Sequence, residues 1–541
     1  MREFTSPDDA TAVGYAALVK AYELDPIISR PLMAVSGRPI NKQTIETDPL
    51  TGKEWIVQRP ELAGVLQKAG ALRDGTLMPA HGQDAERSGA VFAHLDFAVR
   101  HEGINLAVLA QLFPRMDRGA LTRWITGQPT GRTTRRVWYL YELLTGTELE
   151  VTHATAGNYV PVLNQAQQMM GLPRSSRRHR VVDNLLGDAR FSPSVWWTPQ
   201  IKKMVEAGLG DQAKKLVSST DPGVMRRVNN YLYLGESRSS FAIEGEYPED
   251  RHLAGFSNLL ARADRIDRVD KATLLRIERE IMGSNALGDW RSEQTYVGRN
   301  IRHRNYIDYI AARPEDIPSM MDGLLDMMTE GQEYGVDPVS LAALASFGFV
   351  FVHPFPDGNG RTSRFLVHQV LAQAKFTPPG SLFPVSAVML RNEQVYASAL
   401  EAFSRPLMER IRYREDDRGV VTVTEDSAHH YRYFDATPQV EYLYDVIQET
   451  VANDIPLEIS FVRGFEKFVK ASRRVADLTD NQVNLFVQLS TQNGGQLSRK
   501  KRKTEFSDLD DKTIAALEKI YGEAFAPDES DDDEPSDGAE P

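Results

Sequence analysis

The sequence predicts a mainly α-helical protein in which one β-hairpin stands apart. Apolar residues recur with helical spacing almost throughout residues 198–415 and again over 440–525. A single strand, polar turn and strand interrupt the first of these stretches at 293–310. No regular alternation of strands and helices surrounds them, so a doubly wound parallel sheet is not expected.

Four regions are expected along the chain. Residues 1–195 form a mixed N-terminal region, and 196–420 form the helical domain that contains the hairpin. Residues 421–525 form a helical C-terminal region, and 526–541 are a disordered acidic tail without aromatic residues. The net charge of −12 includes eight acidic residues of that tail, so the remaining chain is nearly balanced. Its charge gives no general argument for nucleic-acid binding.

Composition excludes several classes of chemistry. The chain contains no cysteine, which rules out a disulfide framework, thiol catalysis and cysteine-based zinc sites. Residues 1–9 lack the apolar core of a signal peptide. The longest run of low charge, 338–355, falls short of the roughly 20 residues that a membrane span needs. A cytoplasmic protein without a membrane partner is therefore expected.

The N-terminal region contains a second pattern of interest. Two short helices, 106–112 and 120–125, flank Phe113-Pro114-Arg115-Met116-Asp117, which is the outline of a helix-turn-helix. The basic residues that follow are Arg118, Arg123, Arg132, Arg135 and Arg136. Such outlines often arise by chance, so an ordinary helical bundle is the favoured interpretation. Residues 159–170 are also expected to be helical, and the basic run 174–180 is expected to be a surface loop.

The central domain is expected to contain eight helices, with the hairpin between the fourth and the fifth. Their expected bounds are 199–207, 211–217, 224–241, 271–282, 317–329, 339–349, 361–374 and 393–403. In the C-terminal region, 420–424 is expected to be a strand or turn, and helices follow from residue 440. The basic run 499–503 precedes three aspartates, so it is interpreted as a solvated helix entrance.

The stretch from Val350 to Arg364 concentrates groups suited to phosphate chemistry. Two glycines around Asn359 allow backbone N–H groups to converge on an anion, and a helix that begins there adds its positive end. Arg361 and Arg364 lie three residues apart on one helix face. Asp357 would need a cation between itself and a phosphate, and Mg²⁺ is the usual one. His353 is suited to accept a proton near neutral pH.

Three other nucleotide or metal sites fit this stretch less well. The dinucleotide fingerprint fails because Ser363 replaces the third glycine and a helical period precedes the loop. No Gly-x-x-x-x-Gly-Lys-Ser/Thr sequence occurs, so a P-loop is excluded. A catalytic zinc site is disfavoured because His353 and Asp357 have no third ligand nearby in sequence.

The segment His353-Pro-Phe-Pro-Asp357-Gly-Asn-Gly-Arg361-Thr-Ser-Arg364 resembles the signature of the Fic family. Most known members of that family transfer AMP from ATP to hydroxyl side chains of proteins. The resemblance covers residues 224–413 and implies a Fic-type helical core with a hairpin flap. It identifies the chain as a protein adenylyltransferase, a nucleotidyltransferase that AMPylates a Ser, Thr or Tyr hydroxyl of a target protein or of itself.

The resemblance also implies a role for each site residue. His353 would be the general base, and Asp357 would hold Mg²⁺ against the α- and β-phosphates of ATP. Gly358, Asn359 and Gly360 would form the anion nest, and Arg361 and Arg364 would bind the β- and γ-phosphates. Tyr396, on a later helix, would contact the adenosine. Flap residues Tyr296, Val297 and Gly298 would hold the target segment by strand-like hydrogen bonds.

A second match lies upstream of the signature. Ser240-Phe-Ala-Ile-Glu244-Gly245 is similar to the inhibitory motif of the family, and Ser240 and Glu244 share one helix face. The resemblance implies that Glu244 pairs with Arg364 and removes a partner of the γ-phosphate. Glu244 is expected to restrain transfer, and as a base it could instead position water that removes AMP from modified targets.

Two alternatives remain open. One is a DNA-binding regulator whose core only senses nucleotide, resting on the arginines between 118 and 136 and on the basic run 499–503. The other is transfer of UMP or phosphocholine by the same core, because the shape of the pocket selects the transferred group. The target protein, the base preference and the oligomeric state do not follow from the sequence.

Overall fold

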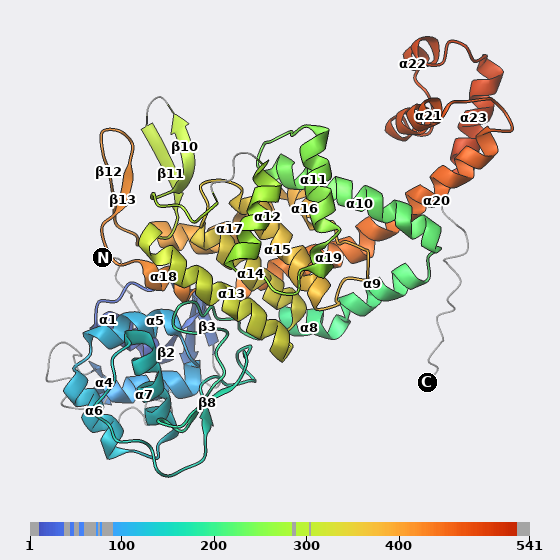
Figure 1. Ribbon diagram of the computed structural model, residues 1–541. Coiled ribbons are helices and arrows are strands. Elements are labelled where there is room, and N and C mark those ends of the chain that lie inside the picture. Colours follow the sequence, from blue (N-terminus) through green and yellow to red (C-terminus); the bar gives the residue numbers. More distant parts are fainter. Residues whose placement is uncertain are drawn as a thin grey trace, which may run out of the picture.

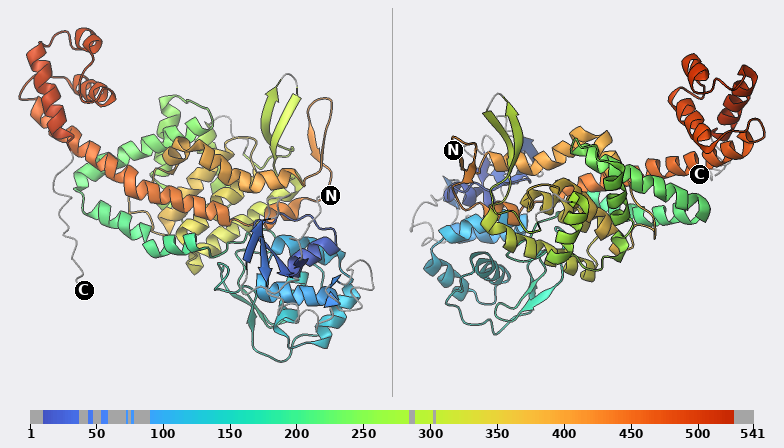
Figure 2. Two further views of the ribbon diagram at one scale, coloured as in Figure 1. Left: turned by 180° about the vertical axis from the view of Figure 1, so that it is seen from behind. Right: turned by 45° about the horizontal axis from the view of Figure 1, so that its top comes forward.

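The computed structural model describes residues 10–36, 44–47, 54–58, 72–73, 76–77, 90–283, 288–301 and 304–526. The protein is mainly α-helical, as the sequence predicts (Figure 1). A mixed N-terminal unit lies beside a large helical core, and a helical arm extends from the core on the far side (Figures 1 and 2). In the described ranges no helix is both long and apolar enough to cross a bilayer. Of the tail predicted at 526–541, residues 527–541 lie outside these ranges.

The N-terminal unit combines a small sheet with helices. Its four strands have the order β1-β2-β4-β3, in which β2 and β4 are parallel and the other pairs antiparallel. The helices share one apolar core that includes Leu95, Leu109, Leu121 and Leu140. The elements are β1 Ala10–Ala12, α1 Gly14–Ala21, β2 Leu32–Ser36, β3 Thr44–Thr47, β4 Glu54–Gln58, α4 Ala90–Phe97, α5 Leu106–Leu112, α6 Arg118–Gly127 and α7 Arg132–Thr145.

The helix predicted at 159–170 is wrong. This segment begins with β7 Val160–Pro161, which pairs with β9 Val181–Asp183, and continues into a turn at 165–167. The N–H groups of Val160 and Val162 donate to carbonyl groups of the 180–182 strand at 3.1 and 3.0 Å. Strand pairing with a distant segment therefore overrides the local helical spacing. The basic run at 174–180 forms the antiparallel partner strand β8 Arg174–Ser176 and the turn into β9.

The central core is built around α14, Pro338–Val352. This helix is apolar on all its faces and almost fully buried, so neighbouring helices cover every side of it. Helices α13, α15 and α19 pack directly against it. The remaining elements are α8 Pro199–Ala207, α9 Leu209–Ser218, α10 Pro222–Ile243, α11 Asp250–Leu260, α12 Lys271–Met282, α13 Ile317–Tyr334, α15 Asn359–Gln373, α16 Val385–Arg391, α17 Glu393–Met408, α18 Ala428–Arg432 and α19 Thr437–Glu449. Helices α11, α16 and α18 are absent from the sequence prediction.

This core continues past residue 420, where the predicted central domain ends. Beyond the short hairpin β12 Tyr413–Glu415 and β13 Val421–Val423, the apolar face of α19 packs against α14. The same apolar cluster reaches Val462 in α20, Ile455–Ser472. The second half of α20 belongs to a separate cluster with α21 Asp480–Gln492 and α23 Asp511–Ala524, whereas α22 Arg499–Thr504 has no buried residue.

The predicted hairpin is present. Strand β10, Tyr296–Ile301, pairs antiparallel with β11, Arg304–Ile310, with a register shift between Val297 and Gly298. Its base is anchored beside the central helix, because the hydroxyl group of Tyr309 donates to the carbonyl group of Phe351. The hairpin projects from the core next to the end of α14 (Figure 1).

A buried carboxylate fixes the end of α10 in the core. Glu236 is 1% exposed, and its Oε1 lies 2.8 Å from Nε2 of His368 on α15. Its Oε2 accepts from the backbone N–H of Ser386 on α16 at 2.9 Å. These bonds join three helices and hold the last turns of α10 against α15, next to the phosphate-type motif.

Candidate active site

A short loop joins α14 to α15 and carries the candidate catalytic histidine. His353 ends α14 in a left-handed conformation with φ of +55°, and its N–H still donates to Phe349 at 2.9 Å. Asn359 closes the loop, because Oδ1 accepts from the N–H of Phe355 at 2.9 Å and Nδ2 donates to the carbonyl of Phe355 at 2.7 Å. The side chain of Asn359 therefore shapes the loop and is itself buried.

The imidazole of His353 is held in one tautomer. Nδ1 lies 3.2 Å from the carbonyl oxygen of Val350. Because a carbonyl oxygen only accepts, Nδ1 carries the hydrogen and Nε2 keeps its lone pair. Burial lowers the pKa of His353 to about 4, so the ring is neutral at pH 7. A neutral ring with an unprotonated Nε2 is the form that accepts a proton.

Arg291 supports this loop and is absent from the sequence prediction. It is 5% exposed and donates to backbone carbonyl groups on both sides of the site. Nε donates to His353 at 2.7 Å, Nη1 donates to Glu293 at 2.7 Å, and Nη2 donates to Ala312. Burial lowers its pKa to about 10, which leaves it charged at pH 7. Arg291 thus ties the catalytic loop to both ends of the hairpin.

Replacing Arg291 by lysine is expected to lower turnover about tenfold or more, in a background where the site is active. Lysine keeps the charge but loses the planar fork that reaches several carbonyl groups at once, and small displacements of a catalytic base are costly. The measurement is kcat and KM for ATP, with Arg190→Lys as the matched control because Arg190 also makes several bonds away from this loop. A loss of thermal stability with kcat unchanged would contradict a positioning role.

The first turn of α15 begins between two glycines. Gly358 precedes the helix with φ of +76°, a conformation that favours glycine. A Cβ atom at Gly360 would lie 2.0 Å from Oε1 of Glu244, so only glycine leaves room for that carboxylate. The carboxylate of Glu244 therefore lies against the positive end of α15, where an anionic ligand would be stabilised.

Arg364 is held by the end of α10. Its side chain is 1% exposed, and Nε donates to the hydroxyl of Ser240 at 2.9 Å. Nη2 donates to the carbonyl of Ser240 at 2.7 Å and to Oε1 of Glu244 at 2.8 Å. The two residues of the matched upstream motif thus both contact the second arginine of the signature.

Arg361 also bonds a carboxylate, that of Glu246, which the sequence prediction missed. Nη1 donates to Oε2 of Glu246 at 2.7 Å, and Nη2 lies 3.3 Å from Oδ1 of Asp357. The guanidinium also lies over the ring of Phe241, 5.0 Å from its centroid. Glu246 follows the end of α10, outside the matched six-residue motif, so helical spacing gave no signal for it. Glu244 and Glu246, which lie two residues apart, therefore bond Arg364 and Arg361, respectively.

Asp357 is better suited to a metal ion that also binds phosphate oxygens than to one held by protein ligands alone. Its side chain is 66% exposed, and Oδ1 accepts from the N–H of Gly358 at 2.6 Å. Among the described residues no group of three or more acidic, histidine or cysteine side chains could hold a metal. One carboxylate supplemented by phosphate oxygens and water is the usual arrangement for Mg²⁺. The donor set therefore fits Mg²⁺ bound together with a nucleotide.

The remaining predicted residues lie around this centre. Tyr396 is on α17, half-buried, and its ring stacks on Tyr442 at 6.0 Å between centroids. Burial raises the pKa of Tyr396, and the Arg364 guanidinium beside it acts in the opposite direction. The predicted flap residues all lie on β10, where Val297 is 47% exposed. The structure thus brings the signature and the segment 240–246 together, with the hairpin anchored at the same loop.

Residues 268–371 match the Fic/DOC family model. The chain contains a Fic/DOC domain. The protein adenylyltransferase fic-1 of Caenorhabditis elegans is 28% identical over 163 residues, which are 28% of this chain and 30% of that protein. The protein adenylyltransferase Fic of Nematostella vectensis is 30% identical over 125 residues, 23% of this chain and 26% of that protein. The chain thus spans less than a third of the length of these relatives.

A solved structure of a Fic family protein from Desulfovibrio desulfuricans covers 57% of this chain and 85% of its own length, with 18% identity and a TM-score of 0.35. The family match begins at residue 268, after α11, so the segment 240–246 lies outside the matched range.

Proposed function

We propose that the Fic domain transfers AMP from ATP to a hydroxyl side chain of a protein. The single observation that carries this proposal is that two buried arginines on α15 and a neutral histidine lie on the same short loop-and-helix segment between α14 and α15. Arg361 and Arg364 are suited to two phosphoryl groups, and His353 Nε2 is suited to a hydroxyl proton. The names of the relatives, protein adenylyltransferases, support the same reaction.

The proposed reaction is an in-line displacement at the α-phosphorus of ATP. The target hydroxyl gives its proton to Nε2 of His353 while its oxygen forms a bond to phosphorus. The bond from the α-phosphorus to the bridging oxygen of the β-phosphate breaks, and pyrophosphate leaves. Arg361, Arg364 and the N–H groups of α15 hold the departing negative charge in place, so positioning and electrostatics supply most of the acceleration.

Asp357 would hold Mg²⁺ against the phosphates, and the ion would neutralise part of their charge.

The flap would present the target in extended form, and the exposed side chain of Val297 next to the predicted contacts Tyr296 and Gly298 supports a docking role. A cytoplasmic location, where ATP is plentiful, belongs to the same proposal. Neither UMP nor phosphocholine is favoured by a specific contact.

The form of the site described here would be a restrained one. Glu244 lies at the anion-binding end of α15 and bonds Arg364, so a γ-phosphate would have to displace a carboxylate. Glu246 adds the same restraint at Arg361. If Glu244 instead positions water to remove AMP from a modified target, its replacement will slow hydrolysis of that target. Incubating modified target with native and variant enzyme distinguishes the two roles.

Replacing Glu246 by glutamine is expected to raise AMP transfer about two- to fivefold. The glutamate is partly exposed, so its ion pair with Arg361 is screened and contributes less than about 1 kcal/mol. The measurement is the initial rate of label transfer from ATP labelled at the α-phosphate. Glu249→Gln is the matched control, because Glu249 is exposed and lies just before α11. Equal rates for the two variants would show that Glu246 does not restrain AMP transfer.

The function itself is tested by the position of the label. Transfer to protein from α-labelled ATP, with none from γ-labelled ATP, is the expected result in a variant released from restraint. Label arriving from the γ-position would indicate phosphorylation and would exclude the proposed reaction.

A further inference from the structure

The N-terminal unit contains a helix-turn-helix that the proposed AMP transfer does not use. Helix α5 is followed by a 3₁₀ turn at Phe113–Arg115 and then by α6. Leu109, Leu112, Leu121 and Ile125 are buried in one core shared with α7. Trp124 stacks on Phe92 of α4 at 5.1 Å, which fixes the rotation of α6. The sequence analysis favoured an ordinary bundle here; the short turn between two helices that share a core is also the element order of DNA-binding helix-turn-helix units.

The outer face of α6 is polar and basic. Arg118 and Arg123 lie on it, and Arg132 begins α7 directly beyond it. All three are exposed, and the side chain of Arg123 is 71% exposed, with Asp117 at 4.0 Å. Exposed side chains able to bond bases or phosphates continue along this face and into the connection to α7: Thr126, Gln128 and Thr130. Asp117 is engaged with the backbone as the cap of α6.

Two of the arginines that follow the helix-turn-helix, Arg135 and Arg136, are not available to a ligand. Arg135 is 2% exposed and donates to the carbonyl of Asn158 at 2.8 Å. Arg136 donates to the carbonyl of Pro161 at 2.7 Å. The expectation that these two contact DNA is therefore wrong, because both hold the 158–161 segment against α7.

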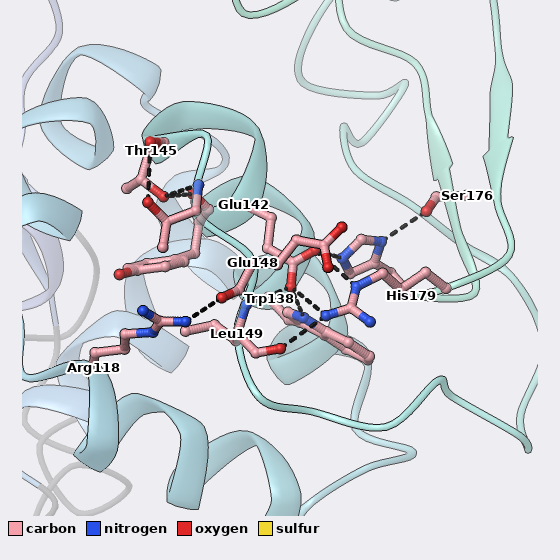
Figure 3. A network of polar contacts seen from close by, with 11 residues as sticks. Arg118, Trp138, Glu142, Thr145, Glu148, Leu149, Ser176 and His179 are labelled. Carbon is pink, nitrogen blue, oxygen red and sulfur yellow. Dashed lines mark hydrogen bonds and ion pairs between the residues drawn. The ribbon is translucent and has the colours of Figure 1, made fainter.

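A buried network holds α7 against the neighbouring 148–149 and 176–179 segments, and Arg118 at the start of α6 lies beside it, donating to the carbonyl group of Glu148 (Figure 3). Glu142 on α7 accepts from Nε and Nη2 of Arg178 at 2.9 Å each and from Nε1 of Trp138 at 2.6 Å. It also lies 2.9 Å from Nε2 of His179 and accepts from the N–H of Leu149 at 2.9 Å. The bonds from Arg178, itself tied to the carbonyl of Leu149, lower the pKa of Glu142 to about 2 although burial alone would raise it. The scaffold behind α6 is thus rigid, as a reading helix requires.

The C-terminal basic run is a weaker candidate. Arg502 on α22 bonds both carboxylate oxygens of Glu518 at 2.8 and 2.9 Å, and Lys501 lies 3.1 Å from Glu505. Two of its five charges are therefore neutralised within the C-terminal cluster. Within the described ranges, Arg123 and Arg132 form no carboxylate bond of this length, and Arg123 lies 4.0 Å from Asp117.

We propose that α6 binds duplex DNA in the major groove, with Arg123 and Arg132 contacting phosphates or guanine edges. The helix-turn-helix supplies the geometry, and the exposed arginines supply charge complementarity to the DNA backbone. This surface needs neither nucleotide nor AMP transfer, so it goes beyond the proposed function. In Figure 1, α6 lies on the lower side of the N-terminal unit and the β10–β11 hairpin projects from the upper side of the core, so the two surfaces are separate.

The test uses the full chain and a fluorescein-labelled duplex pool with a random 20-base-pair centre. Fluorescence anisotropy is measured from about 50 to 200 mM salt. The protein is expected to bind the pool at low salt, and Arg123→Ala combined with Arg132→Ala is expected to weaken binding at least about tenfold and to reduce the salt slope by about two. The control pair is Arg414→Ala with Arg418→Ala, which removes the same charge from exposed positions elsewhere. This pair is expected to stay within about twofold of the native protein.

Three results would overturn the proposal. The first is no binding of the duplex pool at 50 mM salt by folded protein, as verified by circular dichroism. The second is an equal loss of binding in the two double variants, which would indicate attraction by net charge alone. The third is tighter binding of a single-stranded RNA of the same length, which would assign the surface to RNA.

Discussion

Glu244→Gly is expected to raise AMP transfer about 10- to 100-fold. The change removes a charged hydrogen bond to the buried Arg364, and such bonds contribute about 1.5–3 kcal/mol. It also clears the carboxylate that lies over the first turn of α15, so a phosphate can take its place. The measurement is the initial rate of transfer from α-labelled ATP, with KM for ATP expected to fall because the arginine becomes available.

The matched control is Glu249→Gly, which makes the same substitution at an exposed position five residues later. It is expected to leave the rate unchanged. A Glu244 variant that remained as inactive as the native protein with ATP, with other nucleotides and with a cell lysate as a source of targets would refute the restraint.

His353→Ala in the Glu244→Gly background is expected to reduce transfer by about two to four orders of magnitude. The substitution removes the neutral ring whose Nε2 accepts the proton of the attacking hydroxyl, while Arg361 and Arg364 remain able to bind ATP. KM for ATP is therefore expected to change little as kcat falls. The rate of AMP transfer and the binding of a non-hydrolysable ATP analogue, measured by calorimetry, give the two quantities.

His153→Ala controls for the loss of an imidazole, since His153 is exposed in the N-terminal unit. It should leave kcat unchanged. If the His353 variant retained most of the activity, another group would be the base. A loss of nucleotide binding equal to the loss of kcat would instead indicate collapse of the loop between α14 and α15.

The candidate site residues that a sequence motif predicts are contiguous in the chain. His353, Asp357 and the two arginines lie within twelve residues, so their chemistry was visible without the fold. Ser240 and Glu244 are distant in sequence, but helical spacing placed them on one face, and both contact Arg364. The flap was visible because its two strands flank a short polar turn inside a helical domain.

The parts that the sequence missed depend on tertiary contacts. Glu246 lies after the end of α10, where helical periodicity no longer constrains the direction of a side chain. The side chain of Arg291 donates to backbone carbonyl groups. Every residue type has such a group, so the sequence gives no signal for these partners. The helix predicted at 159–170 is absent because β7, at its start, pairs with the distant strand β9. The same tertiary packing separates the buried Arg135 from the exposed Arg123.

Mass spectrometry of the Glu244→Gly protein after incubation with ATP and Mg²⁺ tests the central claim most directly, because it reads the added group and the modified residue together. The predicted result is an increase equal to one AMP on a Ser, Thr or Tyr hydroxyl, absent when His353 is also replaced by alanine. An added mass equal to a phosphate, or an AMP adduct that persists without His353, would contradict the account.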